Sequence, residues 1–251
     1  MNVENQLVFD SYNEWKEPYG NITIPALREE IIRTLPKESF IIHDSLQQAE
    51  HSVEAIIPYL QYFNPKVRII SILVPYMPYD RMDQLSGQLA AGIENVMKAH
   101  GLKWGKDIAF VMSTDAVHYG DEDWGGSNFA FYGSDEKGYA EATKHEMEII
   151  NTALTGVPNE TKTRLFTDYT LKNEDYKSYK WTWCGRYSVP FGLLTIIKLQ
   201  HKLNAGPLLG IFKGYGTSLD EPKLKVDDLM MGKTANASIH HWVGYAGVCY
   251  Y

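Results

Sequence analysis

The sequence predicts an α/β protein with a mostly parallel or mixed central sheet flanked by helices. The chain has 251 residues, of which 44% are hydrophobic and 22% charged, so it is long enough to bury a substantial core. Helical patterns of apolar residues alternate along it with short runs rich in branched residues. The order strand, helix, strand within residues 67–112 indicates a βαβ unit, which requires a parallel pair of strands and a right-handed crossover.

The first elements follow from local patterns. An extended segment at residues 7–12 precedes a helix in PALREEIIRTL, where Pro25 suits the first helical turn. A brief apolar stretch at residues 40–42 comes before EHSVEAIIPYLQYF, a second helical pattern. Pro58 lies inside that pattern, so we expect it to kink or divide the helix.

The βαβ unit comes next. Residues 67–76 are almost continuously apolar, which predicts a strand covered on both faces. A long helix is expected over residues 80–100, followed by a buried strand at residues 108–112.

The second half of the chain continues the alternation. The segment SDEKGYAEATKHEMEIINTAL predicts a helix with Ser134 as its N-cap. Residues 189–204 have a helical pattern, and residues 207–218 and 238–251 resemble strands bounded by glycine. Because no internal repeat or linker interrupts the sequence, we expect a single domain over residues 1–251.

Charge and hydropathy argue against two classes of partner. The formal net charge of -7 and the pI near 5.6 disfavour nucleic-acid binding, which needs a basic face. No apolar run approaches the roughly 20 residues of a membrane span, and the polar start MNVENQLVFD lacks the features of a signal peptide. We therefore expect a cytoplasmic protein whose two cysteines, Cys184 and Cys249, are reduced thiols.

The stretch STDAVHYG places Asp115 and His118 three residues apart, directly after the predicted strand at residues 108–112. Loops at strand ends carry ligand-binding side chains in α/β proteins, and an aspartate beside a histidine fixes its tautomer for acid/base work. The alternative is a capped turn, in which Asp115 bonds the backbone and Gly120 closes the turn.

Other stretches also carry candidate functional groups. His51 in EHSVE lies at a probable helix start, where anions are favoured, although the neighbouring residues also suit an ordinary first turn. In WCGRYSVP, Cys184 and Arg186 suit a nucleophile, a metal ligand or an anion site, although a lone cysteine is often only a small apolar residue. His240 and His241 are consecutive in a predicted strand, so they should point to opposite faces.

Familiar catalytic motifs are missing from the sequence. KHEME, which begins at Lys144, has no second histidine at the fourth position and is not a zinc-protease helix. GYGTS lacks the lysine of a phosphate-binding loop, and no G-x-S-x-G elbow is present.

Five stretches taken together resemble the Memo family. They are EHSVEAIIPYLQYF, VRIISILVPY, FVMSTDAVHYG, WCGRYSVPFGLL and WVGYAGV, in that order, and the resemblance runs from about Val8 to Tyr251. The family includes component B of the AmmeMemoRadiSam system of bacteria and archaea, and it is related in fold to class III extradiol ring-cleaving dioxygenases. The resemblance therefore implies an extradiol-dioxygenase-like α/β fold.

The resemblance also implies a cleft in which His118 holds the position of the family's cleft histidine, with Asp115 beside it. Cys184 matches the cysteine that serves the family as a metal ligand. The related dioxygenases use non-haem iron(II), held by two histidines and a carboxylate. Family members carry two further metal-binding histidines upstream, in H-A-G-Y and S-H-H motifs, and this chain begins after both.

The implied departure affects both fold and cofactor. We expect the family's N-terminal βαβ portion to be missing, and the exposed sheet edge to be covered in another way, such as homodimerisation. A single thiolate does not define an iron, copper or zinc site, so His51 and His118 would have to complete a rearranged one.

Two main functions remain as expectations. The first is binding of a small molecule or peptide in a cleft around Asp115, His118, His51 and Cys184, with other components of the AmmeMemoRadiSam system as further partners. The second is a metal-dependent oxidoreductase in which His118 acts as acid/base; a third possibility is that the cleft residues are relics of ancestry. The expected ligand contacts come from Ser52, Glu54, Tyr119 and Arg186.

Overall fold

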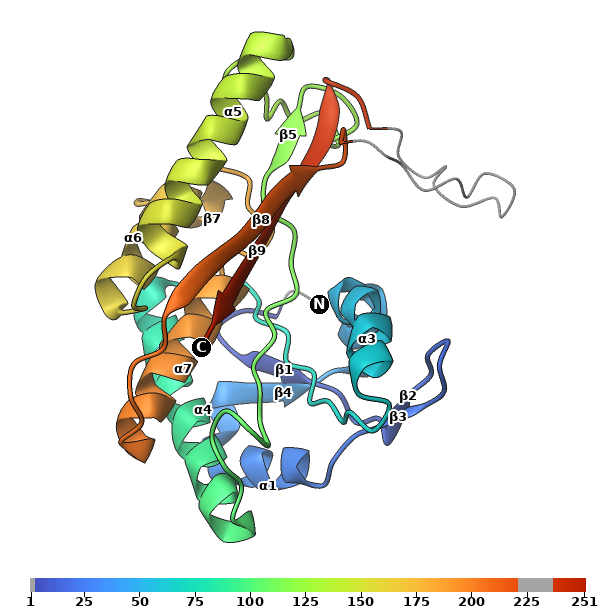
Figure 1. The fold of residues 1–251 in the computed structure, drawn as a ribbon, viewed down its shortest axis with the longest axis vertical. Helices are drawn as coiled ribbons and strands as arrows, with labels where there is room; N and C mark the ends of the chain where they lie inside the picture. Colours follow the sequence, from blue (N-terminus) through green and yellow to red (C-terminus); the bar gives the residue numbers. More distant parts are fainter. Residues whose placement is uncertain (1–2, 221–236) are drawn as a thin grey trace. The chain divides into compact units, whose positions relative to one another are not determined.

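The computed structural model describes residues 3–220 and 237–251 (Figure 1). The chain divides into two compact units. The first unit comprises Met1–Thr114 and Tyr187–Pro207, and the second comprises Asp115–Arg186 and Leu208–Tyr251. Helices and small sheets occur in both, so the predicted α/β class is confirmed. The expectation of a single domain stays a prediction.

The first unit contains helices and two small sheets. Its helices are α1 (Leu27–Thr34), α2 (Asp44–Ala49), α3 (Ser52–Phe63), α4 (Tyr79–His100) and α7 (Ser188–Leu203), with a short 3-10 turn at Lys37–Ser39. Its strands are β1 (Leu7–Phe9), β2 (Glu14–Trp15), β3 (Ile22–Thr23) and β4 (Phe40–Ile42). Strand β1 pairs in parallel with β4, and β2 pairs antiparallel with β3.

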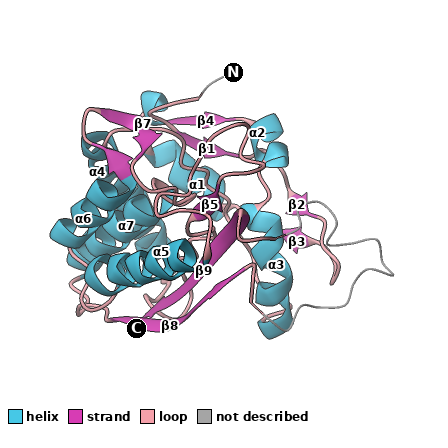
Figure 2. Cartoon of the chain, turned by 90° about the horizontal axis from the view of Figure 1, so that it is seen from above, coloured by secondary structure: helices cyan, strands magenta, loops and turns pink. Residues whose placement is uncertain are grey.

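Helices α4 and α7 form the core of the first unit and lie side by side in both views (Figures 1 and 2). Helix α4 buries apolar residues at spacings of three and four, which is the pattern of a helix with one face in a core. It ends at Gly101, whose φ of 65° is the left-handed conformation that glycine adopts at helix ends. The buried apolar residues of α4 include Met82, Leu85, Leu89, Ile93 and Val96.

The second unit is built on an antiparallel sheet of strand order β5-β9-β8. Its strands are β5 (His118–Gly120), β8 (Gly210–Thr217) and β9 (His241–Tyr250), and a separate hairpin joins β6 (Leu171–Lys172) to β7 (Asp175–Tyr179). Helix α5 (Glu136–Ile149) continues into a π-helical turn at Ile150–Leu154 and is followed by α6 (Glu160–Thr170). Helix α5 lies against this sheet, where the rings of Tyr139 and Trp242 meet edge to face at 5.1 Å.

The prediction of strands at residues 67–76 and 108–112 was wrong, so these segments do not form a βαβ unit. Residues 67–76 form no strand and make a single antiparallel bridge, between Leu73 and Val8. Residues 108–112 run along the surface, where Val111 is half exposed. The physical reason is that branched apolar residues favour extended backbone, whereas a strand also needs a partner along its length.

Most other expected elements are confirmed, with local differences. The helices expected around residues 25–35, 80–100 and 189–204 are formed, as are both glycine-bounded strands. Pro58 lies within α3 without dividing it. Asp135, not Ser134, caps α5, because its side chain accepts a hydrogen bond from the Gly138 N–H at 2.7 Å.

Hydropathy of the helices bears on membrane insertion. Across the residues that the structure describes, no helix combines the length and the apolarity needed to cross a bilayer.

Candidate functional site

The aspartate and the histidine of STDAVHYG form a side-chain pair. His118 opens strand β5, and its Nε2 lies 3.2 Å from Oδ2 of Asp115. The side chain of His118 is 29% exposed and that of Asp115 is 37% exposed, so solvent and ligands can reach both. In this geometry the carboxylate orients the imidazole, which is the arrangement of a histidine that exchanges protons or binds anions.

The pairing of β5 with β9 decides which face His118 occupies. His118 lies opposite Val243, Tyr119 opposite Trp242, and Gly120 opposite His241. Side chains alternate along a strand, so His118 and His241 share one face and Tyr119 and Trp242 share the other.

Tyr119, an expected ligand contact, lies on the inner face. It is fully buried and stacks on Trp242 with ring centroids 4.9 Å apart. Its hydroxyl donates to the Gly133 carbonyl at 3.1 Å and accepts from the Tyr132 N–H at 2.8 Å. Both hydrogen bonds of the Tyr119 hydroxyl are therefore made to backbone groups of the protein itself.

An indole covers the outer face beside His118. The Trp124 ring stacks on the His241 ring at 4.0 Å with an interplanar angle of 17°, and its centroid lies 5.0 Å from that of His118. Trp124 belongs to the loop that follows β5, and no pattern in the sequence had singled it out. The histidine that the sequence identified is therefore flanked by an aromatic surface.

Two histidines make hydrogen bonds to the loop that follows β5. His240 Nδ1 lies 2.8 Å from Oδ1 of Asp121, and His241 Nδ1 lies 3.1 Å from the carbonyl oxygen of Glu122. The hydrogen bond to Asp121 raises the pKa of His240. The expectation that the two histidines sit in one strand and face opposite ways was wrong, because His240 lies in the turn before β9 and both rings bond the same loop.

The segment that carries Cys184 pairs directly with the segment that carries His118. The His118 N–H donates to the Thr182 carbonyl at 3.0 Å, and the Cys184 N–H donates to the Ala116 carbonyl at 3.2 Å. Val117 and Trp183 form an antiparallel bridge between these bonds. By strand alternation, His118 and the exposed Cys184 therefore lie on one face, while the buried Val117 and Trp183 lie on the other.

Arg186, also an expected ligand contact, is buried. The carbon of its guanidinium group lies 3.8 Å from the centroid of the Tyr179 ring, a cation–π contact that fixes the side chain.

A buried carboxylate lies behind this pair of segments. Glu146 of α5 has no exposed surface and accepts hydrogen bonds from the indole N–H of Trp181 at 2.6 Å and of Trp183 at 2.5 Å. It also accepts one from the Val117 N–H at 3.2 Å. Burial raises the pKa of Glu146 to about 7, although these donors favour its charged form.

Sequence reasoning missed Glu146, which lies in the dismissed KHEME stretch. Glutamate within an amphipathic helix is usually a surface residue, so its position gave no signal. The available clue was the pair of indole donors in the KWTWCGR stretch, at Trp181 and Trp183, which need acceptors if they are buried.

The remaining expected residues belong to the first unit, at the start of α3. Oε1 of Glu50 accepts hydrogen bonds from the N–H groups of His51 and Ser52, each at 2.9 Å, at the start of the helix. The His51 side chain is 85% exposed, and Glu54 is exposed as well. The Ser52 carbonyl accepts a hydrogen bond from the Ser113 hydroxyl at 2.6 Å.

The metal centre implied by the family resemblance can be tested on the donor set. Among residues 3–220 and 237–251, there is no group of three or more His, Cys, Asp or Glu side chains that could hold a metal ion. A transition-metal centre needs three or four protein ligands in fixed geometry. The described residues therefore do not fit such a centre.

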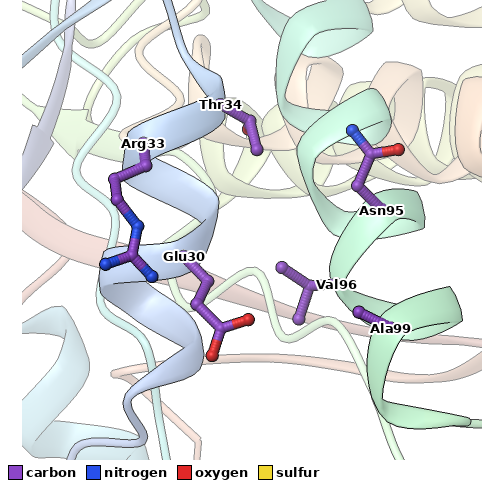
Figure 3. A pocket seen from close by; sticks show the side chains of 6 residues that line it. All are labelled: Glu30, Arg33, Thr34, Asn95, Val96 and Ala99. Atoms are coloured by element: carbon purple, nitrogen blue, oxygen red, sulfur yellow. The ribbon is translucent and has the colours of Figure 1, made fainter.

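A small pocket between α1 and α4 is separate from every expected site residue (Figure 3). Its volume of about 280 Å³ is at the lower limit for ligand sites. One of its polar groups, the Glu30 carboxylate, already lies 2.8 Å from Nε2 of His100. The pocket is lined by Glu30, Arg33, Thr34, Asn95, Val96 and Ala99.

Comparison with known proteins gives consistent results. Residues 2–208 match the sequence model of a family described as Memo-like protein. A MEMO1 family protein of Sulfurisphaera tokodaii is 34% identical over 109 residues, which cover 42% of this chain and 35% of the relative. A MEMO1 family protein of Methanothermobacter thermautotrophicus is 28% identical over 111 residues, which cover 43% and 36%. The matched segment thus spans about a third of each relative's length.

Proposed function

Because the chain belongs to the family of Memo-like proteins, we propose that its second unit binds a small molecule or peptide at a surface centred on Asp115 and His118. The observation that carries the proposal is the accessible 3.2 Å pair of Asp115 and His118, with the exposed Cys184 on the same face. The relatives' names state family membership alone, so the activity proposed here rests on the residues of this chain.

The chemistry of this surface favours a planar ligand with an acidic or hydroxyl group. The imidazole of His118, oriented by Asp115, donates a hydrogen bond to a carboxylate or phenolate oxygen of the ligand. The indole of Trp124 supplies an adjacent flat, apolar surface. Ligand binding and a proton exchange at Nδ1 of His118, the ring nitrogen that is not paired with Asp115, are therefore the events proposed for this site.

Benzoate and catechol are suitable probes, because one is an anionic and the other a neutral planar molecule. We expect at least one of them to shift the NMR resonances of the His118 ring and the Trp124 indole in a saturable way. His118→Ala should weaken binding about tenfold, which corresponds to the loss of one hydrogen bond to a charged group. Asp115→Asn should weaken it less, because the imidazole keeps a neutral partner.

His100→Ala is the matched control, because His100 is also a partly exposed histidine paired with a carboxylate, that of Glu30, in the first unit. It should leave the titration unchanged. The proposal is overturned if neither probe gives a saturable shift, or if His118→Ala binds the probes as well as the unaltered protein does.

A further inference from the structure

The buried carboxylate of Glu146 connects two segments that carry residues of the proposed binding surface. Its oxygen Oε1 accepts the indole N–H of Trp183, which directly precedes Cys184. Its oxygen Oε2 accepts the backbone N–H of Val117, which directly precedes His118. We propose that Glu146 is a positioning residue, which holds the His118 segment and the Cys184 segment in one fixed register.

The backbone of the two segments makes this connection direct. Val117 and Trp183 are cross-strand partners, so the two residues that Glu146 bonds, Val117 by its backbone and Trp183 by its indole, alternate with the two site residues along the same short ladder. A shift of either segment away from the carboxylate would rotate or displace His118 relative to Cys184. That this positioning serves ligand binding rests on the proposed function, whereas the connection itself is a property of the fold.

A strand and two indoles pack closely around the carboxylate of Glu146. Strand β9 passes the carboxylate at Gly244, where an added Cβ would lie 3.2 Å from Oε2 of Glu146 and 2.6 Å from the Tyr215 hydroxyl. The third donor, the indole of Trp181, approaches Oε1 as well. Glu146 has no exposed surface, so these hydrogen bonds lie in the interior, where losing one leaves a buried polar group without a partner.

The titratable groups around the Glu146 carboxylate come from β8 and from α5 itself. The sheet contributes the phenol of Tyr215 from β8, whose pKa is raised by burial and by the Glu146 charge. The segment at residues 181–183 contributes indole groups, and β9 contributes glycine. On α5 itself, the imidazole of His145 and the carboxylate of Glu148 pair with each other at 3.5 Å.

Protonation of Glu146 therefore changes how firmly the two segments are held. A carboxylate is a stronger acceptor than a carboxylic acid, so proton uptake weakens the bonds to Val117 and Trp183. Because burial places the pKa of Glu146 at about 7, this change falls within an accessible pH range.

The test measures the rate at which iodoacetamide alkylates Cys184 as a function of pH, in the full chain with Cys249→Ser. Cys249 is the other exposed cysteine and lies in β9, outside the proposed surface. We expect two inflections, one from the thiol and one near pH 7 from Glu146. Glu146→Gln should remove the second inflection, whereas Glu148→Gln, on the same helix, should leave both.

Trp181→Phe provides a second variant if Glu146→Gln does not fold. Removing one indole donor weakens the support for the charged form, so the inflection near pH 7 should move upward by about half a pH unit or more. A residue with a purely structural role would not move this midpoint. The proposal is overturned if the profiles of the unaltered protein, Glu146→Gln and Trp181→Phe coincide.

The alkylation assay needs no ligand, so it separates this inference from the proposed function. A shifting inflection together with no benzoate or catechol binding would support the positioning role and overturn the binding function. Probe binding that Glu146→Gln leaves unchanged would overturn the positioning role and leave the binding function supported.

Discussion

At the scale of single residues, Glu146 makes the stability of the fold depend on pH. Its pKa rises from 4.5 to about 7 on burial, so the folded state holds a proton that the unfolded state has released between these values. The resulting stabilisation is complete below about pH 4.5 and is lost as the pH rises to about 7. The expected loss is about 3 kcal/mol, the free energy of a shift of this size.

Urea unfolding between pH 4.5 and 7.5 measures this effect. Glu146→Gln should lack this loss. The free energy of unfolding of the unaltered protein should therefore fall by about 3 kcal/mol relative to that of Glu146→Gln as the pH rises across this range. Glu148→Gln, which changes a partly exposed carboxylate of the same helix, should follow the unaltered protein. Parallel curves for the unaltered protein and Glu146→Gln would show that the Glu146 carboxyl does not titrate there.

The candidate site was predicted in part, for reasons that individual residues make clear. The spacing of Asp115 and His118 identified the pair, because three residues suffice to fold an aspartate back onto a histidine at a strand end. Trp124 and Glu146 were missed. Their roles depend on contacts with His241 and Trp183, which are distant in sequence.

At the scale of elements, the end of β5 depends on a glycine. Gly120 has a φ of 129°, and an added Cβ would lie 1.9 Å from the His240 carbonyl oxygen. Gly120→Ala should therefore lower the free energy of unfolding by roughly 3 kcal/mol, through backbone strain and steric overlap together. It should also disturb the loop that carries Trp124, because the Gly120 carbonyl accepts the Phe129 N–H at 2.8 Å.

Gly125→Ala is the control for backbone strain alone. Gly125 has a φ of 63°, and nothing lies within 4 Å of its added Cβ. The substitution should cost about 1 kcal/mol. Equal losses for the two variants in urea unfolding would contradict the steric role of Gly120.

Elements with a strong local signal were predicted well, and those that depend on partners were not. Helix α4 repeats apolar residues at helical spacing over its whole length, and Gly101 stops it. Residues 67–76 carry an equally clear apolar signal, yet that signal specifies no hydrogen-bonding partner. Its one β-bridge joins Leu73 to Val8, so the segment does not become a strand.

At the scale of the whole molecule, each unit has its own core, and this predicts how destabilisation is distributed. Leu89 is buried in α4 of the first unit, and Phe166 is buried in α6 of the second, against Trp183. Truncation of either to alanine should cost about 3 to 5 kcal/mol. In native-state hydrogen exchange, Leu89→Ala should lower protection mainly in the first unit and Phe166→Ala mainly in the second. Equal losses throughout the chain would instead identify one cooperative folding unit.

The division of the chain also affects its synthesis on the ribosome. The first unit uses Met1–Thr114 and then Tyr187–Pro207, with 115–186 of the second unit between them. Helix α7 is therefore translated only after much of the second unit, and until then the apolar face of α4 that packs on it has no cover. The nascent chain must keep that surface from aggregating during the interval, so its folding yield depends on elongation rate and on chaperones that bind apolar segments.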